Sequence, residues 1–159
     1  MDHGILERLF AEHYNGALLY ALSLAKDRAL AEDLVSNAFF KAITARHNEE
    51  ASFKSWLFTV IRNEHTSYHR RYRKQAELSD ALQDEGESLL AELIRDEEYR
   101  ALYHAISLLP KNYGEVITLF YFEELSVREI ARVTKKGEGH IKTTLCRARI
   151  KLKEILEGS

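Results

Sequence analysis

The residue types that make tight turns and cross-links are scarce in this 159-residue chain, which has one proline, seven glycines and one cysteine. Strand-rich folds need many turns, and tight turns depend on glycine and proline. The composition therefore predicts an all-α fold. The single cysteine, Cys146, excludes an internal disulfide and any zinc or iron–sulfur site built on several cysteines.

Long apolar runs are absent as well. No stretch approaches the length that spans a bilayer, and the N-terminus, Met1-Asp2-His3, lacks the basic and then apolar segments of a signal peptide. Apolar residues nevertheless make up 45% of the chain, which is enough for a buried core. We therefore expect a protein without membrane insertion that works in the cytoplasm.

A strong net charge is also lacking, since the chain carries −2 overall. Residues 1–75 hold 11 basic and 9 acidic side chains, residues 76–98 hold 1 basic and 9 acidic, and residues 99–159 hold 11 basic and 7 acidic. Two mildly basic ends therefore flank an acidic middle. The distribution of charge along a chain indicates its binding partners better than the net charge does. Runs of charge are, however, often only solvated surface.

Apolar residues recur at helical spacing in two separate blocks. In the first block the pattern predicts helices over residues 5–22, over residues 29–45 and from Ser52 onward, because serine is a favoured N-cap. Residues 76–91 are acidic and weakly patterned, which is typical of a linker. We therefore predict two small helical domains, residues 1–75 and 92–159, joined by this acidic linker.

The second block begins with two predicted helices. The first covers residues 93–109 and ends at the approach to Pro110. Pro110 suits the first turn of the next helix, whose apolar stripe includes Val116, Phe120 and Tyr121.

A helix-turn-helix pattern closes the second block. Ser126 and Glu129 form a capping box that opens a short helix, residues 135–137 end that helix, and a longer helix follows. Apolar residues at 141, 145, 148 and 152 face inward, so other residues face outward or to the flanks: Lys142, Thr143, Cys146, Arg147 and Arg149. Arginine, lysine and threonine can bind base edges or phosphates in the DNA major groove. The alternative is a solvated amphipathic helix.

Two further features suggest partners. Residues 68–74, YHRRYRK, interleave aromatics with basic groups, which suits the stacked bases and phosphates of a melted strand. The alternative, a solvated helix end where cations meet the negative dipole pole, is the stronger interpretation of this segment alone. Phe40 lies off the inward stripe of its helix, beside Asp33, Ser36 and Asn37, and such a position favours docking on a protein. A single exposed phenylalanine is, however, ordinary.

Enzymatic signals are weak. His65 and His69 have the i,i+4 spacing of a one-helix zinc pair, but no metalloprotease glutamate lies between them and no third ligand is evident. The chain has no glycine-rich phosphate loop and no nucleophile elbow, and nothing around Cys146 resembles a catalytic set. We therefore predict no metal, no cofactor and no enzymatic activity.

Three segments together resemble the extracytoplasmic-function sigma factors of the sigma-70 family. They are AEDLVSNAFFKAI at 31–43, FKSWLFTVIRNEHTSYHRRYRK at 53–74, and the stretch from LPKNYGEVITLF to CRARIKLKEIL at 109–156. The resemblance implies a transcription initiation factor that binds core RNA polymerase, through the clamp of the largest subunit and the flap, and directs it to promoter DNA. An anti-sigma factor is a further implied partner, and the acidic linker would follow the RNA exit path.

The resemblance also implies roles for individual residues. Those facing the polymerase clamp are Asp33, Asn37 and Phe40. Those near the loop that captures a flipped base of the minus-ten element are Asn63, Glu64 and His65. Those that would lie along the nearby DNA backbone are Arg70, Arg71, Arg73 and Lys74. Those facing the minus-thirty-five groove are Lys142, Thr143, Cys146, Arg147 and Arg149.

The chain also departs from the family pattern at several positions. Glutamine is usual at Ser36, aspartate at Ser67 and arginine at Thr144, and the turn usually has glycine and then an apolar residue where this chain has Lys135 and Lys136. These departures affect promoter reading more than family membership. Two alternatives stay open: a sigma-like adaptor without initiation activity, and a stand-alone helix-turn-helix repressor, which usually acts as a dimer.

Overall fold

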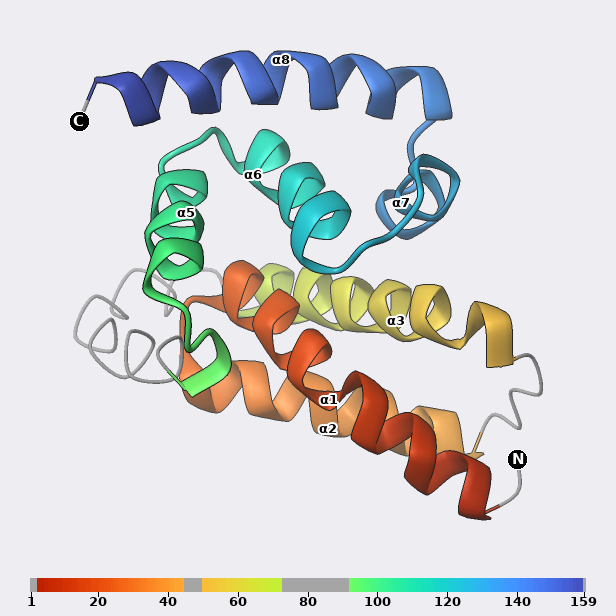
Figure 1. Cartoon of the computed structure of the whole chain (residues 1–159). Coiled ribbons are helices and arrows are strands. Elements are labelled where there is room, and N and C mark those ends of the chain that lie inside the picture. The colour runs from red at the N-terminus through yellow and green to blue at the C-terminus, as the bar shows by residue number, and fades with distance from the viewer. Residues whose placement is uncertain (1–2, 45–49, 73–91, 159) are drawn as a thin grey trace. The chain divides into compact units, whose positions relative to one another are not determined.

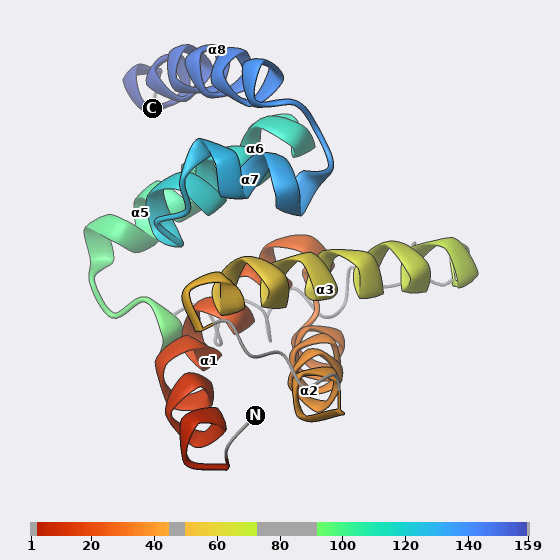
Figure 2. The ribbon, with the colours of Figure 1, turned by 90° about the vertical axis from the view of Figure 1, so that its right-hand side faces the viewer.

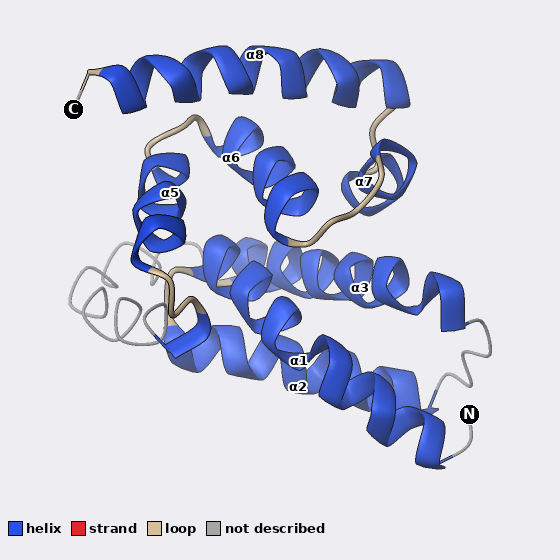
Figure 3. Ribbon diagram, viewed as in Figure 1, coloured by secondary structure: helices blue, strands red, loops and turns tan. Residues whose placement is uncertain are grey.

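The computed structural model describes residues 3–44, 50–72 and 92–158, and every regular element within these ranges is a helix (Figures 1 and 3). The chain divides into two compact units, Met1–Leu89 and Leu90–Ser159. The predicted fold class, all-α with two small helical domains, is therefore confirmed. The linker predicted at 76–91 lies outside the described residues, and the exact domain limits stay predictions.

Three helices form the first unit: α1 (His3–Ala25), α2 (Arg28–Thr44) and α3 (Glu50–Arg71). Each of them packs against the other two, and Figure 2 shows α1 and α3 on different sides of α2. The turn after α1 depends on Lys26, whose φ of 54° is left-handed and whose amide donates to the Leu22 carbonyl at 2.8 Å. The Asp27 carboxylate then accepts a hydrogen bond from the Ala29 amide and caps α2.

The core of the first unit contains the predicted stripe of α2. The buried residues of that helix are Ala31, Leu34, Val35, Ala38, Phe39 and Ala42. From α3, Phe53, Leu57, Phe58 and Ile61 are fully buried. At the start of α1, Ile5 and Phe10 belong to the apolar helical pattern of that helix but are 37% and 46% exposed, and Phe10 packs only partly against α2, through Phe39. α3 also begins two residues before the expected cap.

The second unit contains α5 (Glu97–Ser107), α6 (Lys111–Ile117), the π-helical turn η2 (Thr118–Phe122), α7 (Val127–Thr134) and α8 (Glu138–Glu157). The single helix predicted over 93–109 was wrong, because residues 94–96 are not helical. The Asp96 side chain instead accepts hydrogen bonds from the amides of Glu98 and Tyr99 and starts α5 there. Pro110 directly precedes α6.

The helix-turn-helix pattern is confirmed in its details. The Ser126 hydroxyl accepts from the Glu129 amide at 3.1 Å, and the Glu129 carboxylate accepts from the Ser126 amide at 2.9 Å, so the capping box is complete. Lys135 ends α7 in the left-handed conformation, with φ 60° and ψ 41°. The Lys136 amide donates to the Ala131 carbonyl at 3.0 Å, which closes the turn.

A continuous apolar core holds α8 on the rest of the second unit. Its fully buried members are Ile117, Leu119, Ile130, Val133, Ile141 and Ala148. α8 packs on α5, α6 and α7 through one face, which leaves the opposite face of a 20-residue helix uncovered within the unit. No helix in the described ranges is both long and apolar enough to cross a membrane.

Candidate functional site

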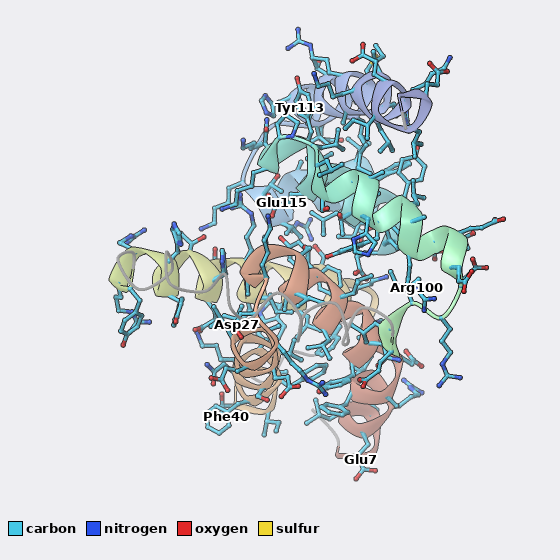
Figure 4. All side chains as sticks on the ribbon, turned by 90° about the vertical axis from the view of Figure 1, so that its left-hand side faces the viewer. Glu7, Asp27, Phe40, Arg100, Tyr113 and Glu115 are labelled. Atoms are coloured by element: carbon cyan, nitrogen blue, oxygen red, sulfur yellow. The ribbon has the colours of Figure 1, made fainter. Side chains whose placement is uncertain are left out.

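One face of α2 is polar and exposed around a single large apolar side chain. Asp33, Ser36 and Asn37 are exposed, and Phe40 is 65% exposed. Figure 4 shows Phe40 pointing away from the rest of the first unit. The buried stripe of α2 lies on the other side of the helix, so the predicted phase of α2 is confirmed.

Phe40 borders a groove of about 440 Å³ between α1 and α2. From α1 the groove is lined by Leu6, Glu7 and Phe10, and from α2 by Ser36, Phe39, Phe40 and Ile43. Phe10 and Ile43 are 46% and 56% exposed, so the rim of the groove is apolar as well as its floor. The Phe10 ring lies 4.7 Å from the Phe39 ring and 5.0 Å from the Tyr14 ring, measured between centroids, and these contacts fix its position.

The contribution of α1 to this groove was missed at the sequence level. Phe10 fits the apolar stripe of α1 by spacing, and spacing alone gives no sign of how much of a side chain a neighbouring helix covers. The available signal was Ile43, an apolar residue one turn after Phe40 on the same outer face of α2. Phe10, Phe40 and Ile43 together form an exposed apolar patch, which we call the apolar docking surface for the role proposed below.

The candidate residues of α3 differ in their exposure to solvent. Asn63, Arg70 and Arg71 are exposed, and so is Ser67. His65 is only 8% exposed, and its ring stacks with that of His69 at 6.0 Å between centroids. In the structure the His65 side chain therefore faces the interior of the first unit rather than solvent.

An ion pair across helices involves another α3 candidate. The Lys41 ammonium of α2 pairs with the Glu64 carboxylate, whose side chain is 20% exposed. At the end of α3, the Tyr68 and Tyr72 rings lie 4.9 Å apart between centroids. Arg73 and Lys74 lie outside the described residues.

The outer face of α8 carries the predicted cationic residues. Lys142, Thr143, Cys146, Arg147 and Arg149 are all exposed, whereas Ile141, Leu145 and Ala148 are buried. Thr144 is 4% exposed and faces the core, so this departure from the family pattern is not on the outer face. The capping box at the start of α7 and the left-handed turn at Lys135 fix the orientation of α8 relative to α7.

Arg149 also makes contacts that the sequence did not predict. Its Nε donates a hydrogen bond of 2.6 Å to the Tyr121 hydroxyl, and its guanidinium lies over the rings of Phe120 and Tyr121. Tyr121, one of the apolar residues expected on the helix after Pro110, is 49% exposed rather than buried with Val116. The reason is η2, in which the Glu123 amide reaches the Thr118 carbonyl five residues back, at 3.1 Å, and shifts the helical phase.

No group of three or more His, Cys, Asp or Glu side chains in the described ranges could hold a metal ion. The His65–His69 pair is thus without a third such ligand there.

Comparison with known families gives two matches in chain order. The family model of sigma-70 region 2 matches residues 9–75, and that of sigma-70 region 4 matches residues 99–152. The first includes α2 and α3, and the second includes the helix-turn-helix.

Whole proteins are similar over nearly the full chain. The ECF RNA polymerase sigma factor SigM of Bacillus subtilis is 31% identical over 156 residues, which cover 94% of this chain and 94% of that protein. The RNA polymerase sigma factor YlaC of the same organism is 27% identical over 164 residues, covering 97% and 93%.

Two solved structures share the fold. The sigma factor RpoE from Bartonella quintana, solved with the anti-sigma factor NepR, matches with a TM-score of 0.71 and 24% identity over 95% of this chain and 96% of that one. CnrH, solved with the cytosolic domain of CnrY, matches with a TM-score of 0.68 and 24% identity over 99% and 91%.

Proposed function

Because the chain belongs to the extracytoplasmic-function sigma factors of the sigma-70 family, we propose that it binds core RNA polymerase and directs it to a defined set of promoters. The observation that best supports this function is the similarity to a relative that is 31% identical over 94% of both chains. The aligned region includes both units of this chain in the same order. The chain acts by binding, without a reaction of its own, and does so in the cytoplasm.

The apolar docking surface, with Asp33 and Asn37 beside it, is the proposed contact with the polymerase clamp. Phe40 is large, aromatic and 65% exposed, and it stands next to a groove that a partner side chain can enter. Aromatic groups at the centre of an interface often contribute ~2 kcal/mol or more to binding. Asp33 and Asn37 supply hydrogen-bonding groups at the edge of the same face.

The exposed side of α3 is proposed to contact the minus-ten element. Asn63 can hydrogen-bond a base edge, and Arg70 and Arg71 can neutralise the phosphates of a separated strand. Contacts of Glu64 and His65 with DNA remain predictions, and each requires a change from the structure: Glu64 must leave Lys41, and His65 must leave its buried position. Contacts of Arg73 and Lys74 remain predictions from the sequence.

The outer face of α8 is proposed to enter the major groove of the minus-thirty-five element. Thr143, Cys146 and Arg147 lie on the side opposite the buried stripe, where base edges are within reach of a helix in the groove. Lys142 and Arg149 lie toward one flank of the same helix and face the backbone. Arg147 is the residue we expect to discriminate most between sequences, because arginine can bind guanine through two hydrogen bonds.

An anti-sigma factor is the proposed regulatory partner. The two structural neighbours were each solved with a second protein, named as an anti-sigma factor for RpoE. We propose that a partner of this class covers the polymerase-binding surface of this chain and competes with core polymerase.

Promoter-directed transcription by purified components tests the proposed function. Core polymerase alone should give no promoter-specific run-off product from a library of genomic fragments, and addition of the chain should produce discrete products that share two upstream elements. Size-exclusion chromatography should show a complex of the chain with core polymerase. In gel shifts at physiological salt the chain alone should show only weak, non-specific binding, because its modest charge allows few net phosphate contacts.

The same experiments separate this function from its two alternatives. A sigma-like adaptor would bind core polymerase without producing discrete transcripts. A stand-alone repressor would bind one DNA sequence tightly as a dimer and would not bind core polymerase.

A further inference from the structure

The side chain of Arg149 lies on the surface of α8, but a hydrogen bond and two cation–π contacts hold it in place. Its Nε donates a 2.6 Å hydrogen bond to the Tyr121 hydroxyl oxygen. Its guanidinium carbon lies 5.4 Å from the centroid of the Phe120 ring and 5.5 Å from that of the Tyr121 ring, both within cation–π range. Both rings belong to η2, the π-helical turn of the second unit. Such turns are rare and are often found at functional sites.

Arg149 lies on a flank of α8 rather than at the centre of its outer face. Each residue turns an α-helix by about 100°, so Arg149 is rotated about 80° from the buried Ile141, whereas Thr143 and Arg147 are rotated about 200° and 240°. When a helix enters the major groove, its outer face approaches the base edges and its flanks approach the two backbones. The position of Arg149 therefore favours phosphate over base.

The guanidinium keeps binding capacity after it has bound Tyr121. It presents five N–H donors in a fixed fork, and the hydrogen bond to the Tyr121 hydroxyl uses only the Nε donor. In the part of the chain that the structure describes, no carboxylate forms an ion pair with Arg149. The Nη donors match the geometry of phosphate oxygens.

We propose that Tyr121 and Phe120 are positioning residues that hold Arg149 as a phosphate-binding residue, so that it anchors α8 to the backbone of the minus-thirty-five duplex. The inference rests on the proposed function, because it requires that α8 lies in a DNA groove. An unrestrained arginine loses rotamer freedom when it is fixed on a phosphate. The rings of η2 have already restricted this side chain in the free protein, so less freedom is lost on binding.

Open-complex formation by the holoenzyme on a library of randomised minus-thirty-five sequences, at several salt concentrations, tests the proposal. Arg149→Ala should lower occupancy of every promoter by a similar factor, about tenfold, because a charge-assisted contact is lost without loss of sequence information. When the logarithm of the binding constant of the holoenzyme for the promoter is plotted against the logarithm of the salt concentration, the slope should become less steep by about 0.9. This is the change expected for the loss of one phosphate contact. Arg149→Lys should keep the wild-type slope without restoring full occupancy, since lysine lacks the planar fork.

Tyr121→Phe isolates the positioning role. This variant keeps the ring and the charge of Arg149 and removes only the hydroxyl acceptor, so occupancy should fall by about threefold on all promoters with an unchanged salt slope. The double variant with Arg149→Ala should be no weaker than Arg149→Ala alone, because Tyr121 acts through Arg149. Tyr99→Phe, a hydroxyl removed from another exposed tyrosine of the same unit, is the matched control and should leave occupancy unchanged.

Several outcomes overturn the proposal. A loss confined to one base-pair position in Arg149→Ala would make Arg149 a base-reading residue. Full additivity of Tyr121→Phe and Arg149→Ala would show that Tyr121 does not act through Arg149. If Arg147→Ala lowers occupancy while the Arg149 and Tyr121 variants do not, this inference fails alone; if Arg147→Ala also has no effect on any promoter, the proposed placement of α8 fails with it. Equal helical circular dichroism of all variants is the folding control.

Discussion

The two units of this chain present chemically opposite surfaces on similar all-helical frameworks. The first unit exposes an apolar docking surface, where Phe40 is 65% exposed beside a groove of about 440 Å³. The second unit exposes the cationic outer face of α8, whose buried side is held by a continuous core. Apolar area removed from water favours a protein partner, whereas dispersed cations favour a polyanion. The contrast fits the proposed division of roles, in which the first unit binds polymerase and the second unit reads the promoter.

The neighbouring phenylalanines of α2 give the largest expected effects. Phe39 is 5% exposed and Phe40 is 65% exposed. Phe39→Ala should lower the free energy of unfolding by about 3–5 kcal/mol, because it leaves a cavity in the core. Phe40→Ala should leave stability nearly unchanged and weaken binding to core polymerase by ~2 kcal/mol or more, which is about thirtyfold.

Urea unfolding and a polymerase binding titration measure the two quantities separately. Each variant is the matched control for the other, since both delete the same side chain from adjacent positions. If Phe40→Ala unfolds the chain instead, Phe40 belongs to the core and the apolar docking surface does not exist.

On α8 the expected effect is smaller and concerns sequence preference. Arg147→Ala should leave polymerase binding unchanged and cost about 1–3 kcal/mol on a cognate promoter, with relaxed preference at one base pair, if Arg147 binds guanine through two hydrogen bonds. Transcription from a panel of minus-thirty-five variants measures this. A uniform loss with a reduced salt slope would instead assign Arg147 to phosphate, and no change on any promoter would remove α8 from the DNA interface.

The turn before α8 should give the smallest effect. Lys135 adopts a left-handed conformation, with φ 60°, that costs a residue with a Cβ about 1–2 kcal/mol, whereas glycine adopts it freely. Glycine also loses more backbone entropy than lysine on folding, which offsets part of this gain. Lys135→Gly should therefore raise the free energy of unfolding by about 0.5–1 kcal/mol. Thermal unfolding measures the change. Lys136→Gly is the matched control, because Lys136 has no positive φ, and it should not stabilise; equal stabilisation by both variants would show that the left-handed turn is not the cause.

Much of the fold followed from the sequence because periodicity and caps are local signals. The apolar stripes of α2 and α8, the capping box at Ser126 and the turn at Lys135 each depend on residues within a few positions of one another. For the same reason the exposed position of Phe40 was predictable: it depends only on the phase of α2.

The features that the sequence did not reveal depend on contacts between distant residues. The exposure of Phe10 depends on how much of its ring α2 covers, and the exposure of Tyr121 depends on the π-helical turn η2. The pairing of Lys41 with Glu64 joins residues 23 apart, and that of Arg149 with Tyr121 joins residues 28 apart. Helical spacing carries no information about such pairs, which is why Glu64 and Arg149 were assigned to DNA without their partners.

The division of work between the two units can be measured in one assay, by titrating the chain against a fixed amount of core polymerase and recording run-off transcription from one cognate promoter. Phe40→Ala should raise the concentration of chain needed for half-maximal transcription by about thirtyfold and reach the wild-type plateau, because only polymerase binding is weakened. Arg147→Ala should keep the wild-type half-maximal concentration and reach a lower plateau. If both variants change the same parameter, or if Phe40→Ala leaves the half-maximal concentration unchanged, the two surfaces do not have separate roles.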